Sequence, residues 1–237
     1  MRFECVSRTH VGLKRKINED SILVETDRGL WVVADGMGGH ESGEIASGMV
    51  VDALRSLPAN PLPDEATADA IDALREVNGK LIEMARVQER SKSIGTTVVG
   101  VLVADGVFRC FWAGDSRAYL MRDGELHRLS RDHSLVQDLV DAGMLKPEEA
   151  EGHANSNVIT RAVGVAQKLE VDVVGGEAKI GDLFLIASDG LTRVMSDTEI
   201  AAEMLKGGSE QMVDRMLECV LERGAPDNVS IILVKIG

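Results

Sequence analysis

The stretch TTVVGVLVADGVFRCFWAGDSRAYLMRDGELHRL, residues 96–129, decides the fold class of this chain. It contains four short runs with the apolar, β-branched composition of strands, at 96–104, 107–113, 118–122 and 125–129. The Asp-Gly pairs 105–106 and 123–124 stand between these runs, and Asp-Gly favours tight hairpin turns. Consecutive hairpins predict an antiparallel sheet.

On both sides of this stretch, strands and helices come in groups. Apolar runs bounded by turn residues predict strands at 3–7, 21–25, 30–34, 169–174, 183–187 and 228–236. Apolar residues at helical spacing predict helices at 43–57, 64–90, 134–142, 197–205 and 209–223. The polar, irregular segment 143–157 suggests a mobile flap. Because hairpins follow one another and helices come in pairs, we expect an α+β fold in a single domain over residues 1–237.

The composition limits the classes of partner. The chain has 237 residues, of which 44% are hydrophobic and 27% charged, as is ordinary for a globular protein. Its net charge of −13 argues against a nucleic-acid partner, because phosphate backbones require dense Lys and Arg. Most of this charge suits a solvated acidic surface. Two bound divalent cations would bring the total from −13 to −9.

The sequence also predicts no membrane partner. It has no apolar run of the roughly 20 residues that span a bilayer, and its first residues, MRFECVSRTHVGLK, lack the apolar stretch of a signal peptide. Cys5, Cys110 and Cys219 lie far apart among apolar neighbours, which favours buried thiols over disulfides or a zinc site. We expect a cytoplasmic protein and a monomer.

Acidic residues in both halves of the chain stand where short apolar strands end or turn. They are Glu19, Asp20, Asp35, Asp189 and Asp227. A carboxylate at a strand end lies near the core yet faces outward, so several can converge on one point. Charges of like sign that lie so close are kept only if a cation separates them. Because oxygen ligands suit Mg²⁺ or Mn²⁺, the pattern predicts a two-metal enzyme.

Helix caps and phosphate-binding loops can produce parts of the same pattern. Either Asp35-Gly36 or Asp189-Gly190 alone could be a helix N-cap or a loop turn, but five such carboxylates are hard to assign to chance. The string GMGGHESG could cradle a phosphate, yet its glycines lack the G-x-G-x-x-G spacing and no Gly-Lys-Ser/Thr closes it. These glycines instead allow close backbone approach to a metal, with the Gly36 carbonyl as an oxygen ligand.

Six strings occur in order from about residue 9 to residue 234: RKINED, VADGMGGH, SIGTT, WAGDSRAYL, LIASDG and PDNVSIILV. This set resembles the metal-dependent protein phosphatase family (PPM, or type 2C protein serine/threonine phosphatases), most of all its compact stand-alone bacterial members. The resemblance implies a four-layer sandwich of two antiparallel β-sheets flanked by pairs of helices. It also implies hydrolysis of phosphoserine and phosphothreonine by a hydroxide that bridges two Mn²⁺ or Mg²⁺ ions.

The resemblance implies a role for each matching residue. Asp35 would bridge both ions, Glu19 and the Gly36 carbonyl would complete one, and Asp189 and Asp227 would hold the other.

Three more positions match the family. Asp115, in AGDSR, resembles the ligand of a weaker third ion that Asp189 shares. Asp20 resembles a catalytic group that orients a metal-bound water. Arg15 matches the arginine that grips the substrate phosphate, although without the resemblance it would more simply be a surface charge in a basic run.

One position departs from the family pattern. Many eukaryotic members have a histidine directly after the Asp-Gly pair, proposed to protonate the leaving alkoxide, whereas this chain has Met37. For His40 we expect a helix-start or packing role, with a metal-bound water as the acid. His133, in RDHS, is expected to be structural.

The implied partners are phosphorylated proteins, a cognate Ser/Thr kinase and that kinase's substrates, among them FHA-domain proteins and secretion systems. Two alternatives stay open. A catalytically inactive relative would only bind partners, but the presence of every expected ligand argues against it. A phosphatase for small phosphorylated metabolites is poorly separated by sequence, since the substrate groove and segment 143–157 carry no readable code.

Overall fold

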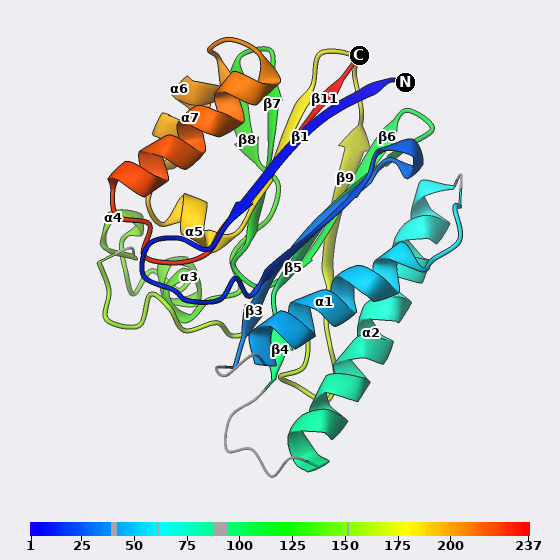
Figure 1. Cartoon of the computed structure of the whole chain (residues 1–237), viewed down its shortest axis with the longest axis vertical. Coiled ribbons are helices and arrows are strands. Elements are labelled where there is room, and N and C mark those ends of the chain that lie inside the picture. The colour runs from blue at the N-terminus through cyan, green and yellow to red at the C-terminus, as the bar shows by residue number, and fades with distance from the viewer. Residues whose placement is uncertain (39–41, 61, 88–93, 151) are drawn as a thin grey trace.

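Two antiparallel sheets stack face to face in the computed structural model, and helices cover both outer faces (Figure 1). The structure describes residues 1–38, 42–60, 62–87, 94–150 and 152–237. The first sheet runs, in spatial order, β1 (Phe3–His10), β11 (Val229–Ile236), β10 (Leu183–Ala187), β7 (Arg117–Arg122) and β8 (Glu125–Arg128). The two ends of the chain therefore pair side by side within this sheet.

The second sheet comes mainly from the first half of the chain. Its order is β2 (Asp20–Glu25), β3 (Leu30–Met37), β5 (Val98–Ala104), β6 (Val107–Ala113) and β9 (Asp172–Glu177), and the short β4 (Gly95–Thr96) also pairs with β3. Both predicted Asp-Gly hairpins are confirmed. Asp105 and Asp123 have positive φ angles of 47° and 53°, and the glycine after each is also positive, as tight hairpin turns require.

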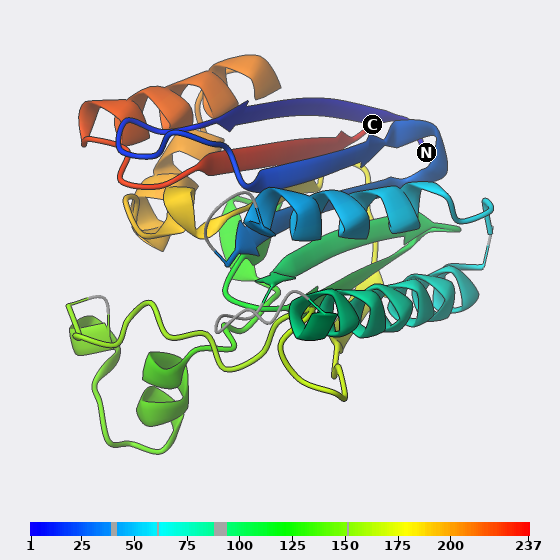
Figure 2. The same ribbon diagram turned by 60° about the horizontal axis from the view of Figure 1, so that its bottom comes forward.

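Helices form the two outer layers. The second sheet is covered by α1 (Ser42–Arg55) and α2 (Pro63–Val87), and the first by α5 (Asp189–Thr192), α6 (Asp197–Met204) and α7 (Ser209–Glu222). The 3-10 helix η1 (Thr26–Arg28) joins β2 to β3. Two short helices, α3 (Leu135–Asp141) and α4 (Pro147–Ala150), lie in a segment that extends away from the sandwich (Figure 2).

Three apolar cores hold the four layers together. Side chains alternate between the faces of a strand, so the neighbours Trp31 and Val32 enter different cores. Trp31 packs between the sheets with Phe184, whereas Val32 faces α1 and α2. A third core joins Leu185 of the first sheet to α6 and α7. The predicted α+β four-layer sandwich is confirmed.

The strand predicted at 169–174 was misplaced, because β9 covers Asp172–Glu177. Its register against β6 runs from Trp112↔Asp172 to Val107↔Glu177, so two glycines that suggest a turn lie inside the strand. A Cβ on Gly175 would come 2.7 Å from the Phe108 carbonyl oxygen. The contact with β6 therefore requires glycine here and overrides local propensity.

The predicted strand at 96–104 is interrupted at Thr97, beside Asp35. The Thr97 amide donates to the Asp35 carbonyl oxygen at 2.8 Å, and β4 and β5 lie on either side of this residue. The sequence had suggested that Asp35 stands at the end of a strand. In the structure Asp35 lies inside β3.

The other predicted elements agree with the structure to within a few residues, although β1 extends to His10. Positions 88–90 of the helix predicted at 64–90 lie outside the described residues. The sequence missed α4 and α5. Among the helices that the structure describes, none is long and apolar enough to cross a membrane.

Candidate metal and phosphate site

Asp20 and Asp35 lie directly opposite each other in the β2–β3 ladder, so their side chains share one face of the sheet. Asp20 is buried, and its Oδ2 accepts a hydrogen bond from Ser188 Oγ at 2.8 Å. Ser188 directly follows β10 of the other sheet. This contact therefore joins the two sheets at the predicted site.

The backbone around Glu19 packs closely against Gly36. The Gly36 amide donates to the Glu19 carbonyl oxygen at 3.1 Å, and the Gly43 amide donates to Glu19 Oε1 at 3.2 Å. A Cβ on Gly36 would lie 2.2 Å from the Gly43 carbonyl oxygen. Only glycine allows this approach, which places the Gly36 backbone beside the Glu19 carboxylate.

Asp189 and Asp227 come from two segments that touch through their backbones. Asp189 is the first residue of α5, and the next residue, Gly190, packs against Asn228 so closely that a Cβ would lie 1.8 Å from its carbonyl oxygen. Asp227 precedes β11 and is partly exposed. The two carboxylates thereby approach the β2–β3 pair from the first sheet.

Arg15 lies at the outer edge of this group. Its Nη2 donates to Asp227 Oδ2 at 2.6 Å, and this hydrogen bond raises the pKa of the arginine. Half of the Arg15 side chain is exposed, so it can also meet a ligand from solution. The predicted phosphate-binding arginine therefore does lie at the carboxylate cluster.

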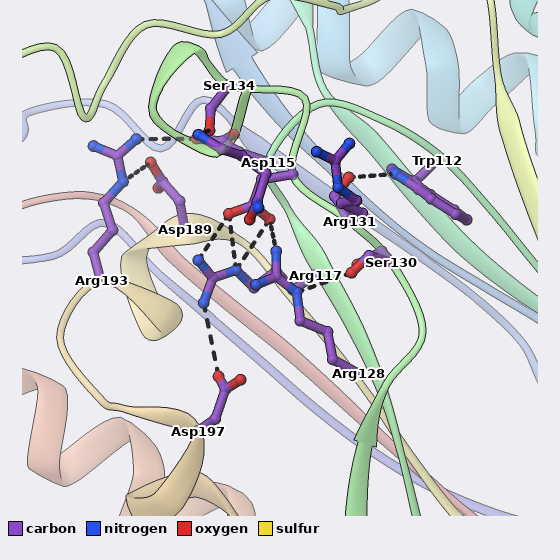
Figure 3. Close-up of polar contacts among 12 residues, drawn as sticks. Trp112, Asp115, Arg117, Arg128, Ser130, Arg131, Ser134, Asp189, Arg193 and Asp197 are labelled. Atoms are coloured by element: carbon purple, nitrogen blue, oxygen red, sulfur yellow. Dashed lines mark hydrogen bonds and ion pairs between the residues drawn. The ribbon is translucent and has the colours of Figure 1, made fainter. Parts of the chain in front are cut away.

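Asp115 lies on the loop between β6 and β7, buried beside Asp189. Arg193 bridges them: its Nη2 is 3.0 Å from Asp115 Oδ2 and its Nε is 2.8 Å from Asp189 Oδ2 (Figure 3). The sequence assigned no role to Arg193. Its spacing from Asp189, one helical turn, was the available signal.

The pKa values show that these carboxylates interact. Burial raises the pKa of Asp35 well above its ordinary value, and the charges of Asp20, Asp189, Asp115 and Asp227 raise it further. Burial likewise raises the pKa of Asp20 to about 6 and that of Asp189 to about 7. All these raised pKa values show that ionising a carboxyl group at this site is unfavourable.

Within the described residues, no three His, Cys, Asp or Glu side chains are grouped as a finished metal site. Three of the predicted ligands instead have an arginine partner: Arg15 contacts Asp227, and Arg193 contacts Asp115 and Asp189. The structure thus brings the predicted residues together, and their roles as ligands stay predictions.

Asn228 is a positioning residue that the sequence reasoning missed. It is buried, and its Nδ2 donates to the Val11 and Ile17 carbonyl oxygens at 2.9 and 3.0 Å. Its Oδ1 accepts from the Glu19 amide at 2.8 Å. Asn228 therefore holds the loop that carries Arg15 and Glu19, and its place directly after Asp227 was the available signal.

His133 makes structural contacts, and Met37 has no proton to supply to a reaction. His133 stacks on Trp112, accepts from the Gly114 amide at its Nδ1 and contacts Asp172, which are structural contacts, as expected. Met37 ends β3, and a thioether has no proton to give a leaving group. The expectation for His40 lies outside the described residues.

A hollow of about 430 Å³ opens beside the cluster. Its lining includes Arg15 and Arg193, the carboxylates of Asp115, Asp189 and Asp227, and Asn157 of segment 143–157. A phosphorylated side chain could reach both arginines from this hollow.

Comparison with known proteins gives consistent matches. A family model described as "Protein phosphatase 2C" matches residues 10–233. Serine/threonine protein phosphatase PstP of Mycobacterium tuberculosis is 35% identical over 230 residues, which are 97% of this chain but only 44% of PstP. The chain thus spans less than half the length of this relative.

Solved structures agree over the whole chain. The structure of PppA, described as a key regulatory component of T6SS in Pseudomonas aeruginosa, is 37% identical with a TM-score of 0.92, covering 99% of this chain and 98% of the other. The catalytic domain of PstP in complex with two manganese ions is 33% identical with a TM-score of 0.86, covering 99% of each chain.

Proposed function

Because the chain belongs to the protein phosphatase 2C family, we propose that it is a metal-dependent phosphatase that removes phosphate from phosphoserine and phosphothreonine in proteins. The observation that carries this proposal is the convergence of carboxylates from both sheets, three of which (Asp115, Asp189 and Asp227) line a hollow together with Arg15 and Arg193. We treat residues 1–237 as one catalytic domain, with segment 143–157 as its flap.

The donor atoms suit two divalent cations. Asp189, which is assigned to one of the ions, has a buried Oδ1 without a hydrogen-bond partner, and such an oxygen is costly unless a cation contacts it. Six carboxylates and two guanidinium groups leave four negative charges, which two divalent ions would balance. Carboxylates and a backbone carbonyl are the ligands that Mn²⁺ and Mg²⁺ prefer. The manganese complex of PstP supports this assignment.

We assign the ligands as the sequence predicted them. Asp35 would be shared by both ions, with Glu19 and the Gly36 carbonyl on one side and Asp189 and Asp227 on the other. When bound, such a pair of ions supplies a water nucleophile of lowered pKa and neutralises charge on the phosphate.

The remaining groups bind the substrate phosphate or move protons. The exposed part of Arg15 would donate to two phosphate oxygens of the substrate. Ser188 holds Asp20 Oδ2, which leaves Asp20 Oδ1 to accept a proton from a water beside it. Because Met37 cannot protonate the leaving alkoxide, we assign that proton to a water at the site.

The partners would be phosphorylated proteins and the Ser/Thr kinase that produces them, with FHA-domain proteins among its substrates. The similarity to PppA, a regulatory component of T6SS, supports a signalling role. Three free cysteines support action in the reducing cytoplasm.

Hydrolysis of a phosphothreonine peptide tests the proposal, with Mn²⁺, with a chelator and with Asp35→Asn. We expect turnover that requires Mn²⁺ and is lost in the variant. Asp123→Asn is the matched control, since it makes the same change in a hairpin turn where asparagine also tolerates positive φ. No turnover by folded protein with any divalent ion would favour the inactive, binding-only alternative. Turnover of small phosphate esters but not of phosphopeptides would favour a metabolite phosphatase.

A further inference from the structure

Arg193 is placed to act as a cation of the site. It follows α5 directly, and its amide donates to the Asp189 carbonyl oxygen at 2.9 Å, so its position relative to Asp189 is set by one helical turn. From there its guanidinium spans Asp189 and Asp115 (Figure 3). About a third of the side chain is exposed, and both carboxylates that it contacts are buried.

All three nitrogens of this guanidinium are engaged by different segments. Nε meets Asp189, Nη2 meets Asp115, and Nη1 donates to the side-chain oxygen of Asn157. These partners belong to α5, to the β6–β7 loop and to segment 143–157. A planar guanidinium suits such a junction, because its donors are fixed in a fork.

The charges explain why this position matters. Asp115 and Asp189 are two buried carboxylates, and an Oδ2 atom of each lies within 3.0 Å of the Arg193 guanidinium. Asp115 is not among the residues assigned to the two-ion centre, so it needs a cation of its own. An arginine on the same chain has a high effective concentration that a dissolved ion must compete with.

We propose that Arg193 is a built-in cation at the Asp115–Asp189 pair, so that this chain binds two divalent ions and not three. The inference rests on the proposed function and replaces the weaker third metal site expected at Asp115. Arg193 is then a positioning residue: it keeps these carboxylates together and fastens Asn157 beside the hollow.

Counting bound metal tests the proposal without measuring activity. Equilibrium dialysis against Mn²⁺, followed by elemental analysis, should give two ions per chain for the wild type. Arg193→Gln removes the charge and should give three, because the carboxylate pair becomes available to Mn²⁺. Arg193→Lys keeps a positive charge and should stay at two. Circular dichroism and thermal unfolding would verify that each variant is folded.

Asn157→Ala separates the two roles proposed for Arg193, which are to neutralise the carboxylate pair and to fasten Asn157. Asn157→Ala should leave the count at two, yet hydrogen exchange of amides 155–158 should become faster, as it should in Arg193→Gln. Three ions in the wild type, or two in folded Arg193→Gln, would overturn the built-in cation. Unchanged exchange in Asn157→Ala would overturn the fastening role. No bound Mn²⁺ in the wild type would overturn the proposed function and this inference with it.

Discussion

Asp20 and Asp35 face each other across the β2–β3 ladder, and Ser188 of the opposite sheet donates a hydrogen bond to Asp20. The two sheets thus meet at a pair of carboxylates whose pKa values are both raised by burial. Two ionised carboxylates at this junction repel each other, so packing in other parts of the sandwich must hold the two sheets together. The stability of the sandwich and the charge state of the site are therefore coupled.

The stability of the metal-free protein should fall as the pH rises from about 4 to 7. In the folded chain the pKa of Asp20 is raised to about 6 and that of Asp189 to about 7, whereas in the unfolded chain both titrate near pH 4. The folded state thus binds more protons in this interval, so its free energy of unfolding decreases with pH. For Asp20 the effect is at most about 3 kcal/mol.

Urea unfolding in the presence of a chelator, at pH 5 and at pH 7.5, measures this effect. Asp20→Asn should lose less stability between the two values than the wild type, and saturating Mn²⁺ should offset the loss in the wild type. Equal pH dependence in the wild type and in Asp20→Asn would contradict the prediction.

Gly36→Ala should destabilise the fold by at least about 2 kcal/mol and weaken Mn²⁺ binding. The new Cβ would lie 2.2 Å from the Gly43 carbonyl oxygen, so the backbone around Glu19 has to move. Gly79→Ala is the control, because it lies within α2 with nothing within 4 Å of its Cβ. This control should stabilise the protein by up to about 1 kcal/mol. Equal thermal unfolding of the two variants would disprove the steric argument.

Asn228→Ala should cost about 2–4 kcal/mol, because the buried Asn228 side chain makes three hydrogen bonds to the backbone, one as acceptor and two as donor, and all three are lost. We also expect weaker Mn²⁺ binding, since Glu19 is held through its amide. Chemical unfolding and metal titration measure the two effects. The exposed Asn155→Ala should change the stability by less than about 0.5 kcal/mol. If Asn228→Ala still bound Mn²⁺ tightly, Asn228 would have no role in positioning the metal site.

Arg15→Ala should raise KM for a phosphothreonine peptide about tenfold to hundredfold, as expected for a lost charge-assisted hydrogen bond. Lys16→Ala, in the same basic run, should leave KM unchanged. Arg15→Lys should be intermediate, because it keeps the charge but loses the fork. Steady-state kinetics at saturating Mn²⁺ give both constants. An unchanged KM in Arg15→Ala would return Arg15 to the role of a surface charge.

Much of the local structure could be predicted because its causes are local. The Asp-Gly pairs at 105–106 and 123–124 determine hairpins through the φ angles of two residues, and those turns formed as expected. β9 could not be placed from sequence, because its register depends on Phe108 and Arg109 of β6, more than sixty residues earlier.

Part of the candidate site could likewise be predicted from the sequence, and part could not. Carboxylates at the ends of apolar runs, in strings that resemble a known family, identified Asp35, Asp189 and Asp227 as candidates. Asn228 and Arg193 were missed because their partners are distant in the chain: Asn228 meets Glu19 209 residues away, and Arg193 meets Asp115 78 residues away. In sequence, Asn228 is only one polar residue within PDNVSIILV, and Arg193 is only a charged residue shortly after LIASDG.

The sequence by itself determined most of the strands, the helix pairs and the residue types of the site, since periodicity, turn chemistry and ligand preference act over a few neighbouring residues. Only the tertiary structure decided that β1 pairs with β11, that Asp20 opposes Asp35, and that Arg193 bridges Asp115 and Asp189. The physical reason is that burial and charge pairing are properties of side chains brought together from distant segments, and no local pattern encodes them.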